Sequence, residues 1–279
     1  MSLLPLTLVR RLAKTVGWLV GWLPVSVTRV TRTNVQLCFP ELAPPARRRL
    51  VRSSLAETAC LIGELGMLFR WPEARWLPLA SNAETSALTA ALAADRGVLI
   101  LAPHFGNWEY LALYLGRLGV MGAYERPHLQ ALDGPLRTAR ERAGMRMWPM
   151  DGGGLRAAYR GLGAGEALIL LPDQVPRRTA GVYAPFFGQP ALTMTLAYRL
   201  AQRTQAQVLL GWARRSGTGF ELGFVPLAEP GLDSTAEAWT AGLNREFEAL
   251  VRTAPAQYQW EYKRFRRPPP GRPNPYQGR

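Results

Sequence analysis

Val98-Leu-Ile-Leu-Ala-Pro-His104-Phe-Gly-Asn-Trp-Glu109 is the stretch from which the fold of this chain is predicted. Its apolar, β-rich first half ends at Pro103, and a Gly-Asn turn follows the histidine. From Trp108 to Leu118 the apolar residues recur at helical spacing. The pattern therefore predicts a buried strand, a turn that carries His104, and a helix.

His104 and Glu109 are predicted to form a pair at the start of that helix. Asn107 is a good N-cap, so Glu109 falls in the first turn, where the helix dipole favours a carboxylate. Residues five apart on one continuous helix lie roughly 140° apart around its axis and do not meet. Because His104 precedes the helix, its imidazole is expected within reach of the Glu109 carboxylate, which would fix the ring tautomer and stabilise its charged form. The structural alternative is a histidine at a strand end beside a glutamate that serves only the helix dipole.

No protein nucleophile accompanies this pair in the sequence. The chain has no G-x-S-x-G elbow, and Cys38 and Cys60 lie far upstream in apolar or helical surroundings. A base without a protein nucleophile suggests that the nucleophile comes from the substrate, most simply as a hydroxyl.

Several segments resemble one family, the late acyltransferases of lipid A biosynthesis, within the glycerolipid acyltransferase superfamily marked by H-x4-D/E. The first is the H-F-G-N-W-E string itself. The others, in chain order, are Asn34-Val-Gln-Leu-Cys-Phe-Pro40-Glu41-Leu, which precedes that string, and four that come after it: Tyr124-Glu-Arg126-Pro127, Leu171-Pro172-Asp173-Gln174, Ala184-Pro-Phe-Phe-Gly188 with Thr193 and Thr195, and Gln257-Tyr258-Gln-Trp260-Glu-Tyr-Lys-Arg264-Phe265. Together they cover the chain from about residue 34 to its C-terminus.

The resemblance implies acyl transfer from acyl-acyl carrier protein, a thioester donor, to a hydroxyl of a lipid A precursor. His104 would act as general base and Glu109 as its orienting partner, with no covalent acyl-enzyme, metal or organic cofactor. Two alternatives stay open: acyl transfer to another amphiphilic glycolipid or phospholipid, and a non-catalytic basic protein of the membrane surface.

Eight further residues are candidates for binding substrate: Asn107, Arg126, Arg140, Arg142, Asp173, Gln174, Thr193 and Thr195. The arginines would bind phosphate, on the acceptor sugar or on the phosphopantetheine arm of the carrier, although each has the alternative of a surface arginine. The family pattern is Y-R-P, so the inserted Glu125 leaves the placement of Arg126 open. Asp173 would orient a basic partner or only cap a loop.

The composition is strongly basic, with a formal net charge of +14 and a pI near 10.7. Such a charge attracts nucleic acid, anionic lipid or an acidic protein. No nucleic-acid-binding motif is present and the basic residues are scattered, so we expect an acidic carrier protein and an anionic membrane surface as partners, and no nucleic acid. Two cysteines supply no disulfide framework and fit a reducing compartment.

Residues 1–33 are predicted to form a membrane-interface segment. The apolar run Val16–Val27 is about twelve residues, whereas a spanning helix needs about 20, and the family usually carries a longer spanning segment here. Trp18 and Trp22 would share a helix face, as is common at a membrane interface. We expect peripheral or monotopic attachment to the cytoplasmic face of the inner membrane; a cleaved signal peptide and an ordinary core helix are the alternatives.

The predicted fold class is α/β, with a largely parallel central sheet flanked by helices in a domain that spans residues 34–265. The predicted strands besides the first are 120–124, 145–150, 167–171, 207–213 and 220–225, and the last two would form an antiparallel edge. Helices are predicted over 43–69 and 83–94, and from a capping box at Ser234-Thr-Ala-Glu237 to about Arg252. Residues 266–279 read as a basic, Pro-rich, mobile tail.

Overall fold

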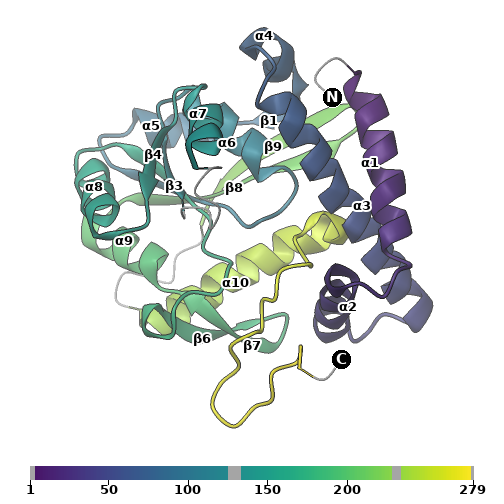
Figure 1. The fold of residues 1–279 in the computed structure, drawn as a ribbon. Helices are drawn as coiled ribbons and strands as arrows, with labels where there is room; N and C mark the ends of the chain where they lie inside the picture. Colours follow the sequence, from purple (N-terminus) through teal and green to yellow (C-terminus); the bar gives the residue numbers. More distant parts are fainter. Residues whose placement is uncertain (1–3, 125–132, 228–233, 278–279) are drawn as a thin grey trace.

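The computed structural model describes residues 4–124, 133–227 and 234–277 (Figure 1). Its α-helices are α1 (Leu6–Val20), α2 (Ser26–Cys38), α3 (Pro44–Leu68), α4 (Glu73–Trp76), α5 (Ser86–Ala93), α6 (Trp108–Gly116), α7 (Asp133–Glu141), α8 (Gly152–Gly163), α9 (Leu196–Thr204) and α10 (Ala236–Thr253). Its strands are β1 (Ala80–Glu84), β2 (Val98–Leu101), β3 (Met121–Tyr124), β4 (Arg146–Pro149), β5 (Ala167–Leu170), β6 (Gly181–Phe186), β7 (Gln189–Met194), β8 (Gln207–Ser216) and β9 (Gly219–Pro226).

A seven-stranded sheet in the order β1-β9-β8-β2-β5-β3-β4 forms the centre of the molecule. Strands β2, β3, β4, β5 and β8 run parallel, which confirms the predicted α/β class. The antiparallel β8–β9 hairpin is also confirmed, but it does not end the sheet, because β1 pairs in parallel with β9 and forms the edge. Residues 83–85, predicted as the start of a helix, therefore belong to β1 and to the connection before α5.

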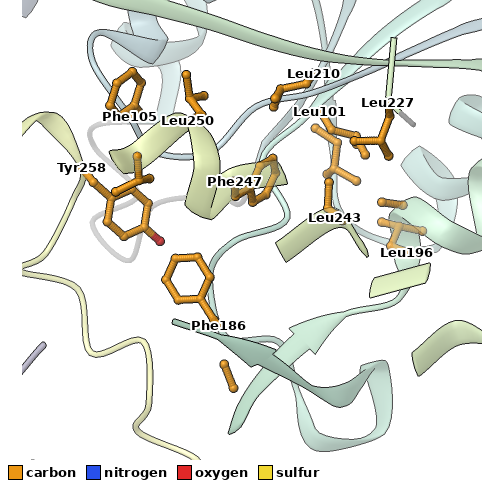
Figure 2. Packing of buried hydrophobic residues seen from close by; sticks show 14 of the residues in the cluster. Leu101, Phe105, Phe186, Leu196, Leu210, Leu227, Leu243, Phe247, Leu250 and Tyr258 are labelled. Carbon is orange, nitrogen blue, oxygen red and sulfur yellow. The ribbon is translucent and has the colours of Figure 1, made fainter. Parts of the chain in front are cut away.

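Helices cover both faces of this sheet. Leu99 and Leu101 of β2 point to the face covered by α8, α9 and α10, and part of the apolar cluster on this side, including Leu101, is drawn in Figure 2. Val98 and Ile100 alternate to the other face, which α5 and α6 cover. Because both faces are covered, all four side chains of β2 are fully buried, which is why this strand is a continuous apolar run in the sequence.

Helix α1 packs lengthwise against α3 at one side of the molecule (Figure 1). Gly17 makes the close approach possible, since a Cβ there would lie 2.2 Å from the carbonyl oxygen of Leu55. The helix is nevertheless apolar on its outer side: Leu8, Leu12, Val16 and Leu19 are exposed. No helix in the described part of the chain is long and apolar enough to cross a membrane.

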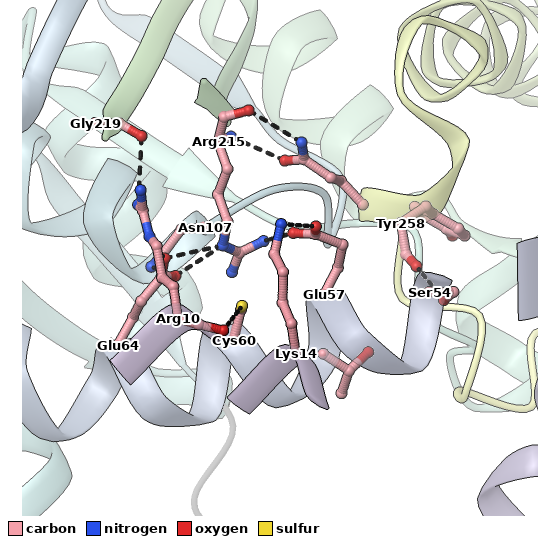
Figure 3. A network of polar contacts seen from close by, with 12 residues as sticks. Arg10, Lys14, Ser54, Glu57, Cys60, Glu64, Asn107, Arg215, Gly219 and Tyr258 are labelled. Atoms are coloured by element: carbon pink, nitrogen blue, oxygen red, sulfur yellow. Dashed lines mark hydrogen bonds and ion pairs between the residues drawn. The ribbon is translucent and has the colours of Figure 1, made fainter. Parts of the chain in front are cut away.

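A buried ion cluster joins α1 to the rest of the fold (Figure 3). The Glu64 carboxylate on α3 is fully buried and accepts hydrogen bonds from Arg10 of α1 (2.7 Å) and Arg215 of β8 (2.8 and 3.0 Å). Arg215 also meets Glu57, which pairs with Lys14 at 2.7 Å. Residues predicted as a membrane segment thus contribute a buried cation to the interior.

The C-terminal residues are held against the domain rather than free. The Tyr276 hydroxyl donates to Asn34 of α2 and accepts from the Phe265 amide, and Arg267 donates to the Pro176 carbonyl at 2.8 Å. The residues predicted as a tail therefore contact the domain at Arg267 and Tyr276. Helix α10 is capped by Thr235, whose hydroxyl accepts from the Ala238 amide, so the predicted cap at Ser234 is displaced by one residue.

The ion cluster predicts a large cost for Glu64→Gln. This change leaves buried Arg10 without a carboxylate partner and leaves Arg215 with only its 3.3 Å pair to Glu57, so it should lower the free energy of unfolding by about 3–5 kcal/mol in chemical denaturation. Glu73→Gln is the matched control, because Glu73 and its partner Arg117 form an exposed pair outside the cluster, and we expect a loss of about 1 kcal/mol or less. Equal losses in the two variants would contradict a structural role for the buried charge.

Candidate active site

His104 lies on the turn between β2 and α6, as predicted, and β8 fixes this turn. Gly106 has φ +63°, and a Cβ there would lie 2.0 Å from the Ala213 carbonyl oxygen. The same oxygen accepts a hydrogen bond from the Asn107 amide at 2.8 Å. Only glycine fits this approach, which explains the Gly-Asn pair directly after the histidine and phenylalanine.

Asn107 is the N-cap of α6, as predicted. Its side-chain oxygen accepts from the Tyr110 amide at 2.8 Å, and its amide donates to Glu64 at 2.7 Å. The side chain is fully buried, so it holds the turn to α3 and has no face left for substrate. This is a correction to its prediction as a substrate-binding residue.

Asp173 is the carboxylate that holds His104. One carboxylate oxygen lies 2.6 Å from the ring Nδ1, and the other accepts from the His104 backbone amide at 2.9 Å. Asp173 follows β5, the neighbour of β2, so the carboxyl ends of two parallel strands bring the pair together. A carboxylate only accepts, so Nδ1 donates and Nε2 is left as the proton acceptor of the neutral ring.

The surroundings of Asp173 keep it ionised. Burial raises the pKa of this carboxyl, but its attraction to the protonated form of His104 and the hydrogen bonds from the His104 ring and backbone outweigh burial and hold the pKa below its ordinary value. Burial and the nearby Asp173 charge raise the pKa of the Tyr258 hydroxyl well above its ordinary value. The Nδ1 side of the imidazole thus faces an ionised carboxylate, and the Tyr258 hydroxyl near that carboxylate stays protonated.

The Nε2 side of the ring is partly open and polar. Gln174 places its side-chain nitrogen 3.2 Å from Nε2 and also donates to Gln259 at 3.1 Å. Trp108 packs its ring edge-on to the imidazole, with ring centroids 5.0 Å apart. The imidazole is therefore clamped on Nδ1 while a small polar group occupies the position in front of Nε2.

Glu109 does not orient the ring, and this part of the prediction is wrong. Its carboxylate accepts two hydrogen bonds from Arg140 of α7, at 2.6 and 2.9 Å, while Asp173 occupies Nδ1 of His104. Burial lowers the pKa of Arg140, but the bonds and charge of Glu109 outweigh this and leave the pKa raised, so the pair stays charged. Glu109 lies near the histidine turn because it is five residues from His104. The acid that contacts the ring is nevertheless Asp173, which follows the neighbouring strand β5.

Three other predicted residues, Arg142, Thr193 and Thr195, lie outside this cluster. Arg126 falls outside the described residues. Arg142 donates to the carbonyls of Leu68 and Trp71, where it fixes the end of α3. Thr193 is buried and accepts from Arg264 at 2.6 Å, and Thr195 donates to the Ala180 carbonyl at 3.3 Å, so both hold the β6–β7 hairpin in place. In the described part of the chain, the hydrogen bonds of Arg142, Thr193 and Thr195 do not reach His104.

Gln259 and Trp108 belong to the site but were not predicted in it. The Gln259 amide donates to the His104 carbonyl at 3.0 Å, and the Gln257 carbonyl accepts from Gly106 at 2.9 Å. The closing Q-Y-x-W string is thus the segment that packs on the histidine turn. Its motif was visible in the sequence, but no local pattern connects residues about 155 positions apart.

A histidine clamped by a buried carboxylate at the carboxyl end of a central strand is a site suited to proton transfer. A sequence model of the bacterial lipid A biosynthesis acyltransferases matches residues 1–267, and the chain belongs to this family and is an acyltransferase.

Relatives of this chain are named as transferases of acyl groups. It is 30% identical over 257 residues to the lipid A biosynthesis lauroyltransferase of Escherichia coli K12, which covers 89% of this chain and 82% of the relative. It is 28% identical over 251 residues to the palmitoleoyltransferase of the same organism, with 88% and 81% covered. A phosphatidylinositol mannoside acyltransferase of Mycobacterium tuberculosis is 29% identical over 181 residues, with 61% and 55% covered.

The lowered pKa of Asp173 predicts a pH-dependent share of stability. An unfolded aspartate titrates at about 3.9, so the contribution is complete above that pH and is lost as the pH falls through the lower folded value. The difference in unfolding free energy between wild type and Asp173→Asn should therefore shrink from about pH 4 to pH 2. Asp95→Asn removes an exposed carboxyl and should show no such change. A constant difference for Asp173→Asn would contradict the ionised pair.

Proposed function

We propose that this chain transfers a fatty acyl group from acyl-acyl carrier protein to a hydroxyl of a lipid A precursor. The observation that carries the proposal is the hydrogen bond between His104 and Asp173, because a proton held on Nδ1 by Asp173 leaves Nε2 as the ring atom that can accept the hydroxyl proton. The relatives named as lauroyl and palmitoleoyl transferases of lipid A supply the substrate class.

In the proposed reaction Nε2 takes the proton of the acceptor hydroxyl as its oxygen attacks the thioester carbonyl carbon. The tetrahedral intermediate collapses, the carbon–sulfur bond breaks, and the imidazolium returns the proton to the departing thiolate. Asp173 is a positioning residue that fixes the tautomer and offsets the charge on the ring. The acceptor hydroxyl displaces the Gln174 amide from the front of Nε2, and Gln174 then donates to that oxygen.

Glu109 has a different proposed role, as the anchor of Arg140. The carboxylate takes Nε and one terminal nitrogen of the guanidinium, and the other terminal nitrogen has no partner among the described residues. That nitrogen is placed to donate to an anionic oxygen, either the tetrahedral oxyanion or a substrate phosphate. The H-x4-E string then supplies the base and, separately, the anchor of a cation.

A second class of acyl acceptor, another glycolipid, is the alternative to a lipid A precursor. The phosphatidylinositol mannoside acyltransferase matches over 181 residues, so acyl transfer to another glycolipid fits the same clamp. Mass spectrometry of lipids from cells with and without the protein distinguishes the two: loss of a secondary acyl chain on lipid A supports the proposal, and loss from another glycolipid supports the alternative.

Helix α1 supports attachment to a membrane surface. Leu8, Leu12, Val16 and Leu19 lie at spacings of four, four and three, on one exposed side of the helix, and Trp18 and Trp22 continue the apolar surface. Soluble surfaces rarely carry such a continuous apolar patch. We propose that this side lies in the headgroup layer of the cytoplasmic face of the inner membrane, while Arg10 on the buried side holds the helix to the domain.

Three variants separate the proposed roles in a purified assay with acyl-acyl carrier protein and a detergent-dispersed lipid A precursor. His104→Ala should lower kcat by about 10²–10⁴-fold, since the base is removed. Asp173→Asn should approach that loss, because an amide facing Nδ1 permits the wrong tautomer. Glu109→Gln should be milder, because glutamine retains one bond to Arg140.

Two results would count against this assignment. Wild-type turnover in folded His104→Ala would show that His104 is not the general base. A larger loss of kcat in Glu109→Gln than in Asp173→Asn would assign the orienting role to Glu109 instead of Asp173. Equal turnover with acyl-coenzyme A would count against a carrier-protein donor.

Membrane attachment predicts a loss of binding for Leu12→Gln combined with Leu19→Gln. Both side chains are more than half exposed, so the fold should survive while the apolar contribution of about 1.5–3 kcal/mol per inserted leucine disappears. Vesicle flotation should show affinity at least tenfold lower. Leu118→Gln with Met150→Gln, two exposed apolar residues on other elements, is the control and should bind as wild type does.

A further inference from the structure

The end of α1, the helix α2 and the start of α3 lie at one corner of the molecule (Figure 1). A basic hollow of about 280 Å³ is lined by residues of these three segments. Its walls include Trp22, Arg32, Arg47, Arg48 and Arg52. Arg47, Arg48 and Arg52 lie in the first three turns of α3, and Arg32 lines the same hollow from α2. Four cations therefore line one small volume, and no acidic residue is among its lining residues.

Arg52 is fixed in this hollow without a partner for all of its donors. Its guanidinium carbon lies 4.2 Å from the ring centroid of Trp22 and 5.5 Å from that of Trp18. Its Nε is buried and has no hydrogen-bond partner among the described residues. A buried donor left unpaired costs about 1–3 kcal/mol, so its presence points to an acceptor that enters from outside.

The other cations are also uncompensated. Within the described ranges, Arg32, Arg47 and Arg48 form no ion pair with a carboxylate. Grouped charges of one sign raise the local concentration of an oppositely charged ligand, and planar guanidinium groups match the oxygens of a phosphate. The chemistry of the hollow is therefore that of a phosphate site.

The apolar side of α1 indicates what carries the phosphate. Trp22 belongs both to the wall of the hollow and to the exposed surface formed with Trp18, Leu19 and Leu23. A ligand seated here would place its phosphate among arginines and its apolar part along α1. At a bilayer surface, tryptophan side chains are enriched in the interfacial layer and arginine side chains bind the lipid phosphates, which matches the arrangement of Trp22 beside the arginines.

The hollow is separate from the His104 site. Arg52 and Ser54 are two positions apart on α3, so they point roughly 200° apart around its axis. Ser54 faces the catalytic side, where its hydroxyl lies 3.5 Å from the Tyr258 carbonyl oxygen. A phosphate bound by Arg52 is therefore on the opposite side of α3 from the reacting atoms.

We propose that the arginine hollow formed by Arg32, Arg47, Arg48 and Arg52 beside Trp22 is a binding site for the phosphate headgroup of an anionic membrane phospholipid. It rests on the proposed membrane attachment of α1 and adds a specific headgroup to it. The site fixes how the protein is turned on the membrane, because the apolar side of α1 and the phosphate must be engaged at once.

The test compares two double variants that remove equal charge from the same two helices. Arg32→Gln with Arg48→Gln alters the hollow, and Arg29→Gln with Arg49→Gln is the control, because all four residues are exposed and only the first pair lines the hollow. Flotation uses vesicles of phosphatidylcholine alone and vesicles with about 30 mol% phosphatidylglycerol. The hollow variant should lose about tenfold more affinity for the anionic vesicles than the control variant, and both should retain kcat with a detergent-dispersed acceptor.

Other outcomes overturn the proposal in distinguishable ways. Equal losses in the two variants mean a diffuse basic surface instead of a site. A raised KM for the detergent-dispersed acceptor, with vesicle binding unchanged, assigns the phosphate to the substrate. Weaker binding of the acidic carrier protein, again with vesicle binding unchanged, assigns the hollow to the donor. A wild-type protein that binds neither vesicle overturns the attachment as well, while the turnover assay leaves the acyl transfer itself standing.

Discussion

The structure depends on one buried carboxylate, Glu64. It accepts from Arg10 on α1, from Arg215 on β8 and from Asn107 at the start of α6, so three segments remote in sequence meet at one side chain. The Asn107 bond matters for function, because the same asparagine caps the helix that follows the histidine turn. A change in the charge of Glu64 would therefore reach the N-terminal helix and the position of His104 together. Isolated ions are costly in an interior, and this cluster survives because every charge has a neighbour of opposite sign.

The site separates two jobs that the H-x4-E string would assign to one pair. Asp173 holds the imidazole through its ring and its backbone, and Glu109 holds Arg140. Parallel strands explain this division: β2 and β5 are neighbours, so the residues that follow their carboxyl ends face each other across one strand spacing. Glu109 sits in the first turn of α6 and points to α7. An acid five residues from a histidine is close in space, and closeness alone does not decide which nitrogen it meets.

Helix α1 has two environments on its two sides. Arg10 is buried and ion-paired on the inner side, whereas leucines and tryptophans lie in solvent on the outer side. In a soluble bundle the apolar side would be the buried one. Here buried Leu6 and Val9 and the Arg10 ion pair hold the inner side of the helix to the domain, so the outer apolar surface remains available to a partner. The arginine hollow lies at the end of that surface, which joins the two features into one proposed orientation on a lipid bilayer.

The sequence by itself determined the strand, turn and helix around His104, the parallel α/β class, the β8–β9 hairpin and the N-cap at Asn107. These follow from local periodicity and from capping chemistry, which act over a few residues. The tertiary structure alone decided that Asp173 and not Glu109 holds the ring, that Gln259 packs on the histidine turn, that β1 closes the sheet edge, and that Arg10 is buried. Each of these depends on which segments become neighbours when strands pair across long stretches of chain, and no local pattern encodes that choice.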